Sequence, residues 1–361
     1  MSNGDAKRDG ALDGIRGIAI AMVLLQHYFV ALQVPGNSSI WNAVAHRMTL
    51  AWSGVDLFFV LSGFLIVGIL LDAKGSPRYF RTFYTRRACR IFPLYFLLVA
   101  AMYAAKLTVL GKSDWLFGGN FSLPHYLTFT QNFFAIDKWY GPNWTGITWS
   151  LAIEEQFYLV IPLLVFFCRK RVLATVFLLC IAAAPMFRAL WGQHAGYIHT
   201  LARADSLLLG GLVAMGMRDA NVKELLRRTA PALFAAGFFG AFLCQRFWRE
   251  PGMVWSHLIM SSWFAAAVAG LSCGALPILR RMCAARPLRW LGTRSYGIYL
   301  LHMAASGCLY FLLLGRERPL MSDGAAIAVT ILSLAVTFFC AELSFRWFES
   351  YFLKAGRHVN Y

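Results

Sequence analysis

Two ionisable residues in the first apolar stretch of the chain, Arg16 and His27, are spaced so that they could act together. Eleven residues of α-helix turn through about 1,100°, close to three full turns, so both side chains would point the same way, about 16 Å apart. An arginine suits an anionic group, and an imidazole suits proton transfer or transient acyl carriage. An anchoring Asp13–Arg16 pair beside a packing histidine explains the same residues, and the sequence leaves both interpretations open.

Acidic and basic residues also interrupt later apolar stretches, at Asp56, at Glu154 and Glu155, and at Arg203 and Asp205. Ionisable groups inside a bilayer cost several kcal/mol, so each of them is a candidate for function. Helix packing does not readily explain two adjacent carboxyl groups, whereas Arg203 and Asp205 could pair with each other or with Glu154. Counting along each stretch from its expected outer end places all five residues in the outer half of the membrane.

A basic loop over 72–90 ends in Arg87 and Arg90, which are three residues apart where a helix is expected to begin. Guanidinium groups on one helix face suit phosphate oxygens. Membrane topology, or contact with anionic lipid head groups, accounts for such a loop as simply. Together with Arg16, Arg294 and His302, the two arginines form an expected basic inner group. A polyanionic donor would then bind on the inner side and a hydroxyl acceptor on the outer side.

Apolar stretches that could position these residues run along nearly the whole chain. Apolar residues make up 59% of the 361 positions and charged residues only 14%, well below the roughly 25% of a soluble domain. A hydrocarbon core needs about 20 apolar residues in a helix. The sequence therefore predicts an all-α integral membrane bundle, with residues 1–361 as one polytopic domain. About ten transmembrane helices are predicted, near 12–34, 50–71, 91–110, 147–167, 172–191, 201–217, 230–247, 256–279, 295–314 and 325–345.

The basic residues are distributed between these stretches, so the net charge of +17 does not indicate nucleic-acid binding. Most of the 34 Lys and Arg residues fall in connections that would share one side of the membrane with both chain ends. The positive-inside rule places that side, and both termini, in the cytoplasm. The eight cysteines form no CxxC pair and no pattern with histidine, so we expect neither disulfides nor a metal site.

The candidate residues lie in ordered motifs that resemble membrane-bound acyltransferase family 3, bacterial O-acyltransferases of surface polysaccharides and related sugars. The order and spacing of the motifs match the family over nearly the whole chain. The motifs are Leu12-Asp13-Gly14-Ile15-Arg16-Gly17 with His27, Gly54 through Phe64, Arg87 through Tyr95, Trp149 through Tyr158, and Ser295 through His302.

The resemblance implies that Arg16 and His27 are the arginine–histidine pair of the family, with His27 essential, and that Arg87 and Arg90 serve acyl-CoA use. Glu154 corresponds to the acid of the family's Trp-Ser-Leu…Glu motif. Members take an acyl group, usually acetyl, from cytoplasmic acyl-CoA, and their acceptors include O-antigen, exopolysaccharide, peptidoglycan, lipo-oligosaccharide signals and macrolide sugars. Some relatives carry a C-terminal esterase-like domain, which we do not expect here because the chain ends soon after its last apolar stretch.

The resulting expectation is a multi-pass enzyme of the bacterial cytoplasmic (inner) membrane that transfers an acyl group from acyl-CoA to a carbohydrate hydroxyl, without a metal. His27 would act as general base or transient acyl carrier, oriented by Asp56 or Glu154. The expected site residues are His27, Glu154 and Asp56 for catalysis; Arg16, Arg87, Arg90, Ser62, Tyr296 and His302 for acyl-CoA; and Glu155, Trp149, Arg203 and Asp205 for the acceptor.

Two other functions would use a similar inventory of residues. A proton-coupled transporter or flippase also buries histidine, acids and arginine, but the inverted repeat common in transporters is not evident here. A non-catalytic sugar-binding scaffold could use Trp139, Tyr140, Trp144 and Trp149, although such aromatic residues more often anchor a protein at the membrane interface. Turnover of a thioester would distinguish an acyltransferase from both.

Overall fold

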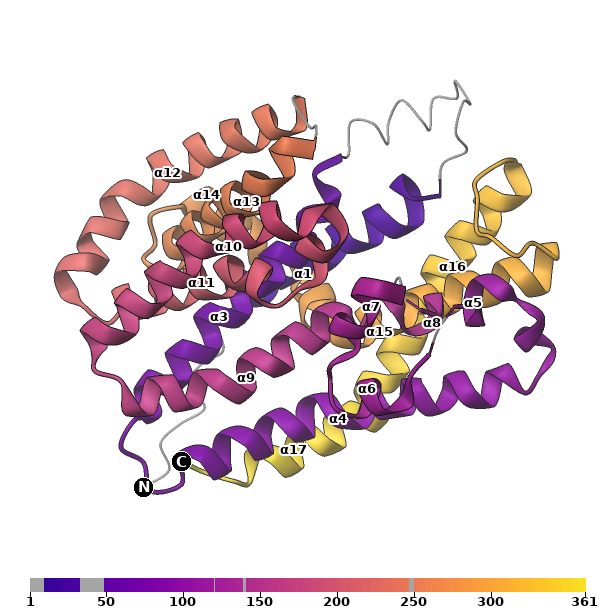
Figure 1. The fold of residues 1–361 in the computed structure, drawn as a ribbon, viewed down its shortest axis with the longest axis horizontal. Helices are drawn as coiled ribbons and strands as arrows, with labels where there is room; N and C mark the ends of the chain where they lie inside the picture. The colour runs from indigo at the N-terminus through magenta and orange to yellow at the C-terminus, as the bar shows by residue number, and fades with distance from the viewer. Residues whose placement is uncertain (1–9, 33–48, 120, 139–140, 247–249) are drawn as a thin grey trace.

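The computed structural model describes residues 10–32, 49–119, 121–138, 141–246 and 250–361, and every regular element within these ranges is helical. The first elements are α1 (Gly10–Leu25), the π-helical turn η1 (Gln26–Val30), the 3₁₀ turn η2 (Thr49–Ser53), α3 (Gly54–Ala73) and α4 (Tyr79–Lys106). Short helices follow: η3 (Val109–Lys112), α5 (Asp114–Phe117), α6 (Leu123–Leu127), α7 (Gln131–Lys138) and α8 (Asn143–Gly146). In Figure 1 these short helices gather between α4 and α15.

Longer helices make up most of the remaining chain and complete the bundle (Figure 1). In chain order, the remaining elements, long and short, are α9 (Trp149–Phe167), α10 (Lys170–Ile198), η4 (Leu201–Arg203), α11 (Ala204–Gly216), α12 (Ala220–Arg246), α13 (Glu250–Ser272), α14 (Pro277–Cys283), α15 (Arg286–Leu314), α16 (Gly324–Leu343), η5 (Ser344–Glu349) and α17 (Ser350–Arg357). The C-terminal α17 lies along α4, where Thr82 donates a hydrogen bond to the main-chain carbonyl of Asn360 at 2.9 Å.

Within the described residues, seven helices are long and apolar enough to cross a membrane, by their length and composition. These candidate spans are Leu50–Ala73, Tyr79–Lys106, Asn143–Phe167, Lys170–Ile198, Val254–Ser272, Arg286–Leu314 and Gly324–Arg357. Each corresponds to one of the ten predicted stretches, so the all-α membrane architecture agrees with the sequence. The higher count and the side on which the termini lie stay predictions.

The other three predicted stretches, 12–34, 201–217 and 230–247, are not among the candidate spans found in the described residues. The second corresponds to α11, whose 13 residues form about 20 Å of helix, less than a hydrocarbon core of about 30 Å. The third corresponds to α12, which is long enough but carries Lys223 and two arginines in its first turns. The first continues beyond the described residues.

Three helices begin earlier in the chain than the hydropathy pattern predicts. Helix α4 begins at Tyr79 instead of near 91, the span that contains α9 begins at Asn143, and α15 begins at Arg286 instead of near 295. Polar and basic residues that were assigned to loops therefore form the first turns of helices. This shift changes the positions that were counted from the expected ends of these three helices.

Glycines allow α1 and α15 to pack backbone against backbone. A Cβ atom on Gly17 would lie 2.0 Å from the carbonyl oxygen of Leu288, and one on Gly292 would lie 1.7 Å from that of Asp13. No larger residue fits at either position without moving a helix. Small residues at helix crossings are typical of membrane bundles. The contact holds the first helix firmly against α15, which carries the last predicted motif.

Candidate active site

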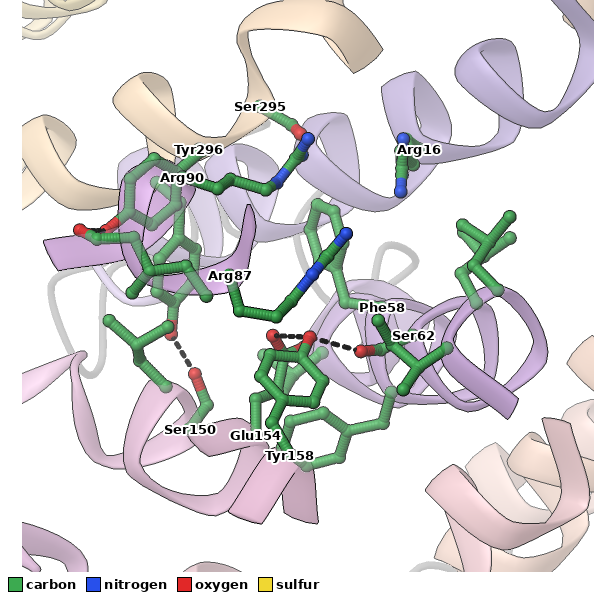
Figure 2. Close-up of a pocket in the computed structure, with 18 of the residues that line it drawn as sticks. Arg16, Phe58, Ser62, Arg87, Arg90, Ser150, Glu154, Tyr158, Ser295 and Tyr296 are labelled. Atoms are coloured by element: carbon green, nitrogen blue, oxygen red, sulfur yellow. Dashed lines mark hydrogen bonds between the residues drawn. The ribbon is translucent and has the colours of Figure 1, made fainter. Parts of the chain in front are cut away.

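A cavity of ≈ 180 Å³, the arginine pocket, lies between α1, α3, α4, α9 and α15 (Figure 2). Six predicted site residues line it: Arg16, Ser62, Arg87, Arg90, Glu154 and Tyr296. Its wall on α3 extends from Ile69 to Val55, a separation of about 14 residues and therefore about 21 Å. The pocket is elongated along the helices. Beside Ser62, Gly63 faces away into a tight crossing, where its Cβ would lie 1.8 Å from the carbonyl oxygen of Leu207 on α11.

Arginines from two helices make this pocket basic. Figure 2 shows Arg16 of α1 and Arg87 and Arg90 of α4 directing their guanidinium groups into the same space. Arg16 also forms the anticipated ion pair with Asp13, at 3.5 Å, while its role toward an anion stays a prediction. The Arg87 guanidinium lies 5.9 Å from the centre of the Tyr158 ring, and within the described part of the chain it has neither a hydrogen bond nor an ion pair. It can therefore bind an anion without first giving up a partner.

Glu154 is the single acid among the described residues that line the pocket. Its Oε2 accepts a hydrogen bond from the Tyr158 hydroxyl at 3.0 Å, and the hydroxyl groups of Tyr158 and Ser62 are 2.5 Å apart. The expected separation of Glu154 from the arginines is wrong, because it lines the same pocket as they do. Its span begins at Asn143, so Glu154 is about 17 Å from that end of the helix.

Tyr299 forms part of the opposite end of the arginine pocket. Its hydroxyl donates to the main-chain carbonyl of Ile147 at 2.7 Å and accepts from Ser150 at 2.7 Å. The Tyr299 ring lies 6.5 Å from that of Phe58 and 5.9 Å from that of His302. Tyr296, one turn earlier, donates its hydroxyl hydrogen to the Ile91 carbonyl at 2.6 Å. The pocket therefore ends in hydrogen-bonded aromatic side chains, next to a histidine.

His302 contacts His27 directly, and neither lines the arginine pocket. The two ring centres are 4.9 Å apart, and His302 Nε2 is 3.3 Å from His27 Nδ1. The expected grouping of His302 with the inner arginines is wrong. Because α15 begins at Arg286, His302 lies about 24 Å along it, just past the middle of the helix. Arg16 therefore lines the pocket, whereas His27 lies outside its lining, next to His302.

Asp56 is part of a separate group of buried charges, and it does not orient His27. The Asp56 Oδ1 accepts from Arg203 at 2.7 Å and from Ser206 at 3.1 Å, and lies 3.3 Å from His257 Nδ1. Asp56 and Arg203 are both 0% exposed. The expected Arg203–Asp205 pair is also absent from the described contacts, because Asp205 accepts from Arg188 at 2.8 Å. We call Asp56, Arg188, Arg203, Asp205 and His257 the closed network.

Two members of the closed network, Arg188 and His257, were not predicted. Each is a lone polar residue in an apolar stretch, and that was the signal available in the sequence. Both line a second cavity of ≈ 260 Å³ beside Gly192, where α10 bends at a φ of 75°. Within the described residues, Asp56 Oδ2 and Arg203 Nε have no hydrogen-bond partner. The other atoms of the closed network that are named in the preceding paragraph have hydrogen-bond partners inside the protein.

Of the remaining predicted acceptor residues, Trp149 is buried and Glu155 is partly buried. Trp149 is 7% exposed and packs between Phe59, at 6.4 Å, and Tyr197, at 4.9 Å, so it offers no open face to a sugar. Glu155 has one buried oxygen, Oε1, without a partner among the described residues. Trp144 is 8% exposed, while Trp139 and Tyr140 lie outside the described residues. Nor do the described residues contain three or more His, Cys, Asp or Glu side chains placed to hold a metal ion.

The chain matches the model of an acyltransferase-domain family over residues 9–342. This range contains the whole arginine pocket and both contacting histidines. The protein therefore belongs to this family of acyltransferases, and the resemblance to membrane-bound acyltransferase family 3 is confirmed.

Among curated proteins, the chain is 29% identical to "Putative peptidoglycan O-acetyltransferase YrhL" of Bacillus subtilis, over 94% of this chain and 54% of the relative. It is 27% identical to peptidoglycan O-acetyltransferase OatA of Listeria monocytogenes, over 97% of this chain and 56% of the relative. A Staphylococcus aureus protein, "Putative O-acetyltransferase SACOL0978", is 25% identical over 96% and 57%. The chain thus spans about half the length of the relatives it matches. No solved structure matches it.

Proposed function

We propose that this protein is a membrane O-acyltransferase that moves an acetyl group from acetyl-CoA to a hydroxyl group of a cell-envelope glycan, with peptidoglycan as the first acceptor to test. The observation that carries the proposal is the elongated pocket, which is basic at one end and at the other is lined by Tyr299, whose ring lies 5.9 Å from that of His302, the partner of His27. The family membership supports acyl transfer, and the names of the relatives suggest the acceptor.

The arginine pocket suits a donor with a phosphorylated head and an extended arm. Guanidinium groups donate paired hydrogen bonds to phosphate oxygens, and three arginines would compensate a polyanionic head group. The wall of about 21 Å on α3 gives an extended chain room to run from Ile69 to Val55. In this arrangement the thioester would lie beside Phe58 and Tyr299, at the end nearest the two histidines.

His27 acts as the general base in the proposed reaction. The acceptor hydroxyl gives its proton to an imidazole nitrogen, and its oxygen bonds to the acetyl carbonyl carbon. The carbon–sulfur bond of the thioester then breaks, and the leaving thiolate takes the proton from the imidazolium. The products are an O-acetyl ester, free CoA thiol and neutral His27. Donor and acceptor approach from opposite sides, with the arginines and both termini facing the cytoplasm of a bacterial inner membrane.

Label transfer in proteoliposomes tests this function. Purified protein would be given acetyl-CoA labelled in the acetyl group together with peptidoglycan fragments, and label in the glycan would be measured. We expect transfer by the wild type and a loss of about 10²- to 10⁴-fold in His27→Ala. His358→Ala, which removes an exposed histidine, is the control and should keep the rate. Glycan movement across the membrane without thioester turnover would instead identify a transporter.

A further inference from the structure

His302 and His27 are held together by more than their own contact. Tyr28, next to His27 in the chain, donates a hydrogen bond to the main-chain carbonyl of His302 at 2.8 Å. Its hydroxyl also lies 2.8 Å from that of Thr337 on α16. With the glycine contacts between α1 and α15, these bonds fix two backbones on either side of the imidazole pair. The packing of the two helices therefore holds the two imidazole rings in contact.

The partners of the ring nitrogens determine where each hydrogen lies. His302 Nδ1 is 2.7 Å from the Tyr299 carbonyl, which can only accept, so Nδ1 carries the hydrogen of the neutral ring. His302 Nε2 is then a hydrogen-bond acceptor. It faces His27 Nδ1 at 3.3 Å, and the same His27 nitrogen lies 3.0 Å from the Val23 carbonyl. Two acceptors around one nitrogen require that His27 Nδ1 be the protonated one.

We propose that His302 is a positioning residue that holds His27 in the Nδ1-protonated tautomer, so that Nε2 is the atom that takes the proton from the acceptor hydroxyl. This inference rests on the proposed function. His27 Nε2 has no hydrogen-bond partner within the described part of the chain, and the side chain is only partly buried. Nε2 is therefore the nitrogen of His27 that is left for a substrate hydroxyl.

The same contact serves the protonated intermediate. When His27 Nε2 takes the acceptor proton, both nitrogens of the imidazolium carry hydrogen. Its Nδ1 still donates to His302 Nε2 and to the Val23 carbonyl. These two acceptors, already in place, stabilise the positive charge of the imidazolium. His302 neither gains nor loses a proton. Return of the Nε2 proton to the leaving thiolate restores the starting tautomers.

Two substitutions of similar shape test the role of His302. In His302→Gln, the side-chain oxygen can replace Nε2 as the acceptor, whereas His302→Met fills similar space without a strong acceptor. In the proteoliposome assay, we expect Met to lower kcat at least about tenfold with little change in the KM for acetyl-CoA, and Gln to restore most of the loss. Equal kcat values for the Met variant and the wild type, or equal losses in both variants, would overturn the proposal.

Failure of this inference is distinguishable from failure of the proposed function. If His27→Ala abolishes transfer while His302→Met keeps it, the acyltransferase assignment stands and the positioning role is wrong. A measurement on the wild type covers the case in which a variant does not fold. Nitrogen NMR of histidine-labelled protein in lipid, with the His27 signals assigned by comparison with His27→Ala, should give a protonated Nδ1 and an unprotonated Nε2. The opposite tautomer would refute the proposal.

Discussion

The arginine pocket and the closed network both place arginines and acids among apolar helices, but they compensate those charges differently. In the closed network, Arg203 and Asp56 are fully buried and joined at 2.7 Å. In the pocket, Arg87 faces a cavity and the Tyr158 ring and, within the described residues, has no hydrogen bond or ion pair. A buried ion pair needs close partners to offset its desolvation, whereas a cation beside a cavity is available to a ligand. The comparison assigns stability to one region and binding to the other.

Removal of Arg203 should give the largest effect on stability. In Arg203→Met, the Asp56 carboxylate would remain buried without its cation, which we expect to lower the free energy of unfolding by about 3–5 kcal/mol. Denaturant unfolding in detergent micelles measures this loss. The double variant Arg203→Met/Asp56→Leu should recover part of it, because neither charge then remains. Unchanged stability together with lost transfer would contradict the comparison and return Arg203 to the acceptor site.

Removal of Arg87 should affect donor binding and leave stability nearly unchanged. A hydrogen bond to a charged group contributes about 1.5–3 kcal/mol, so Arg87→Met should raise the KM for acetyl-CoA by roughly 10- to 150-fold. Arg81→Met is the matched control, since Arg81 is exposed on the same helix. A KM unchanged by Arg87→Met, or raised equally by both substitutions, would show that the pocket does not bind the phosphates through this residue.

The sequence identified the residues of the site better than their depths. Six predicted residues line the pocket, because buried charge in an apolar stretch is conspicuous and the motifs are specific. Glu154 and His302 were each grouped with the wrong neighbours, since the helices that carry them begin earlier than hydropathy indicates. In a hydropathy profile, the polar residues in the first turn of a helix cannot be told from loop residues. Packing against neighbouring helices nevertheless keeps them helical. Depth therefore depends on boundaries that hydropathy locates poorly.

The partners of buried charges were the least predictable feature. Asp56 was expected beside His27, but its carboxylate contacts Arg203 and His257, which come from distant parts of the chain. Such pairings depend on how α3, α11 and α13 pack, and one sequence does not specify that packing. The Asp13–Arg16 pair was predictable because i,i+3 residues are neighbours on any helix.

Removal of a single hydroxyl group gives the smallest and most selective test of the comparison. Tyr158→Phe would take away the group between Ser62 and Glu154 in the pocket, and Ser206→Ala would remove a donor to Asp56 in the closed network. Each hydrogen bond is worth about 0.5–1.5 kcal/mol. We expect Tyr158→Phe to lower kcat/KM roughly 2- to 12-fold at unchanged stability, and Ser206→Ala to lower stability at unchanged kcat/KM.

The two hydroxyl variants are informative because their chemistry is matched and only their surroundings differ. Both hydroxyl groups donate to a carboxylate inside the bundle, at 3.0 and 3.1 Å. If the effects were interchanged, with stability lost at Tyr158 and activity lost at Ser206, the second cavity beside His257 would become the better candidate for the reaction site. Equal effects on activity would mean that the two regions act as one unit. The expected result, activity lost at Tyr158 and stability lost at Ser206, follows only if the two regions differ in how their buried charges are compensated. The presence of buried charge alone would not distinguish a binding region from a structural one.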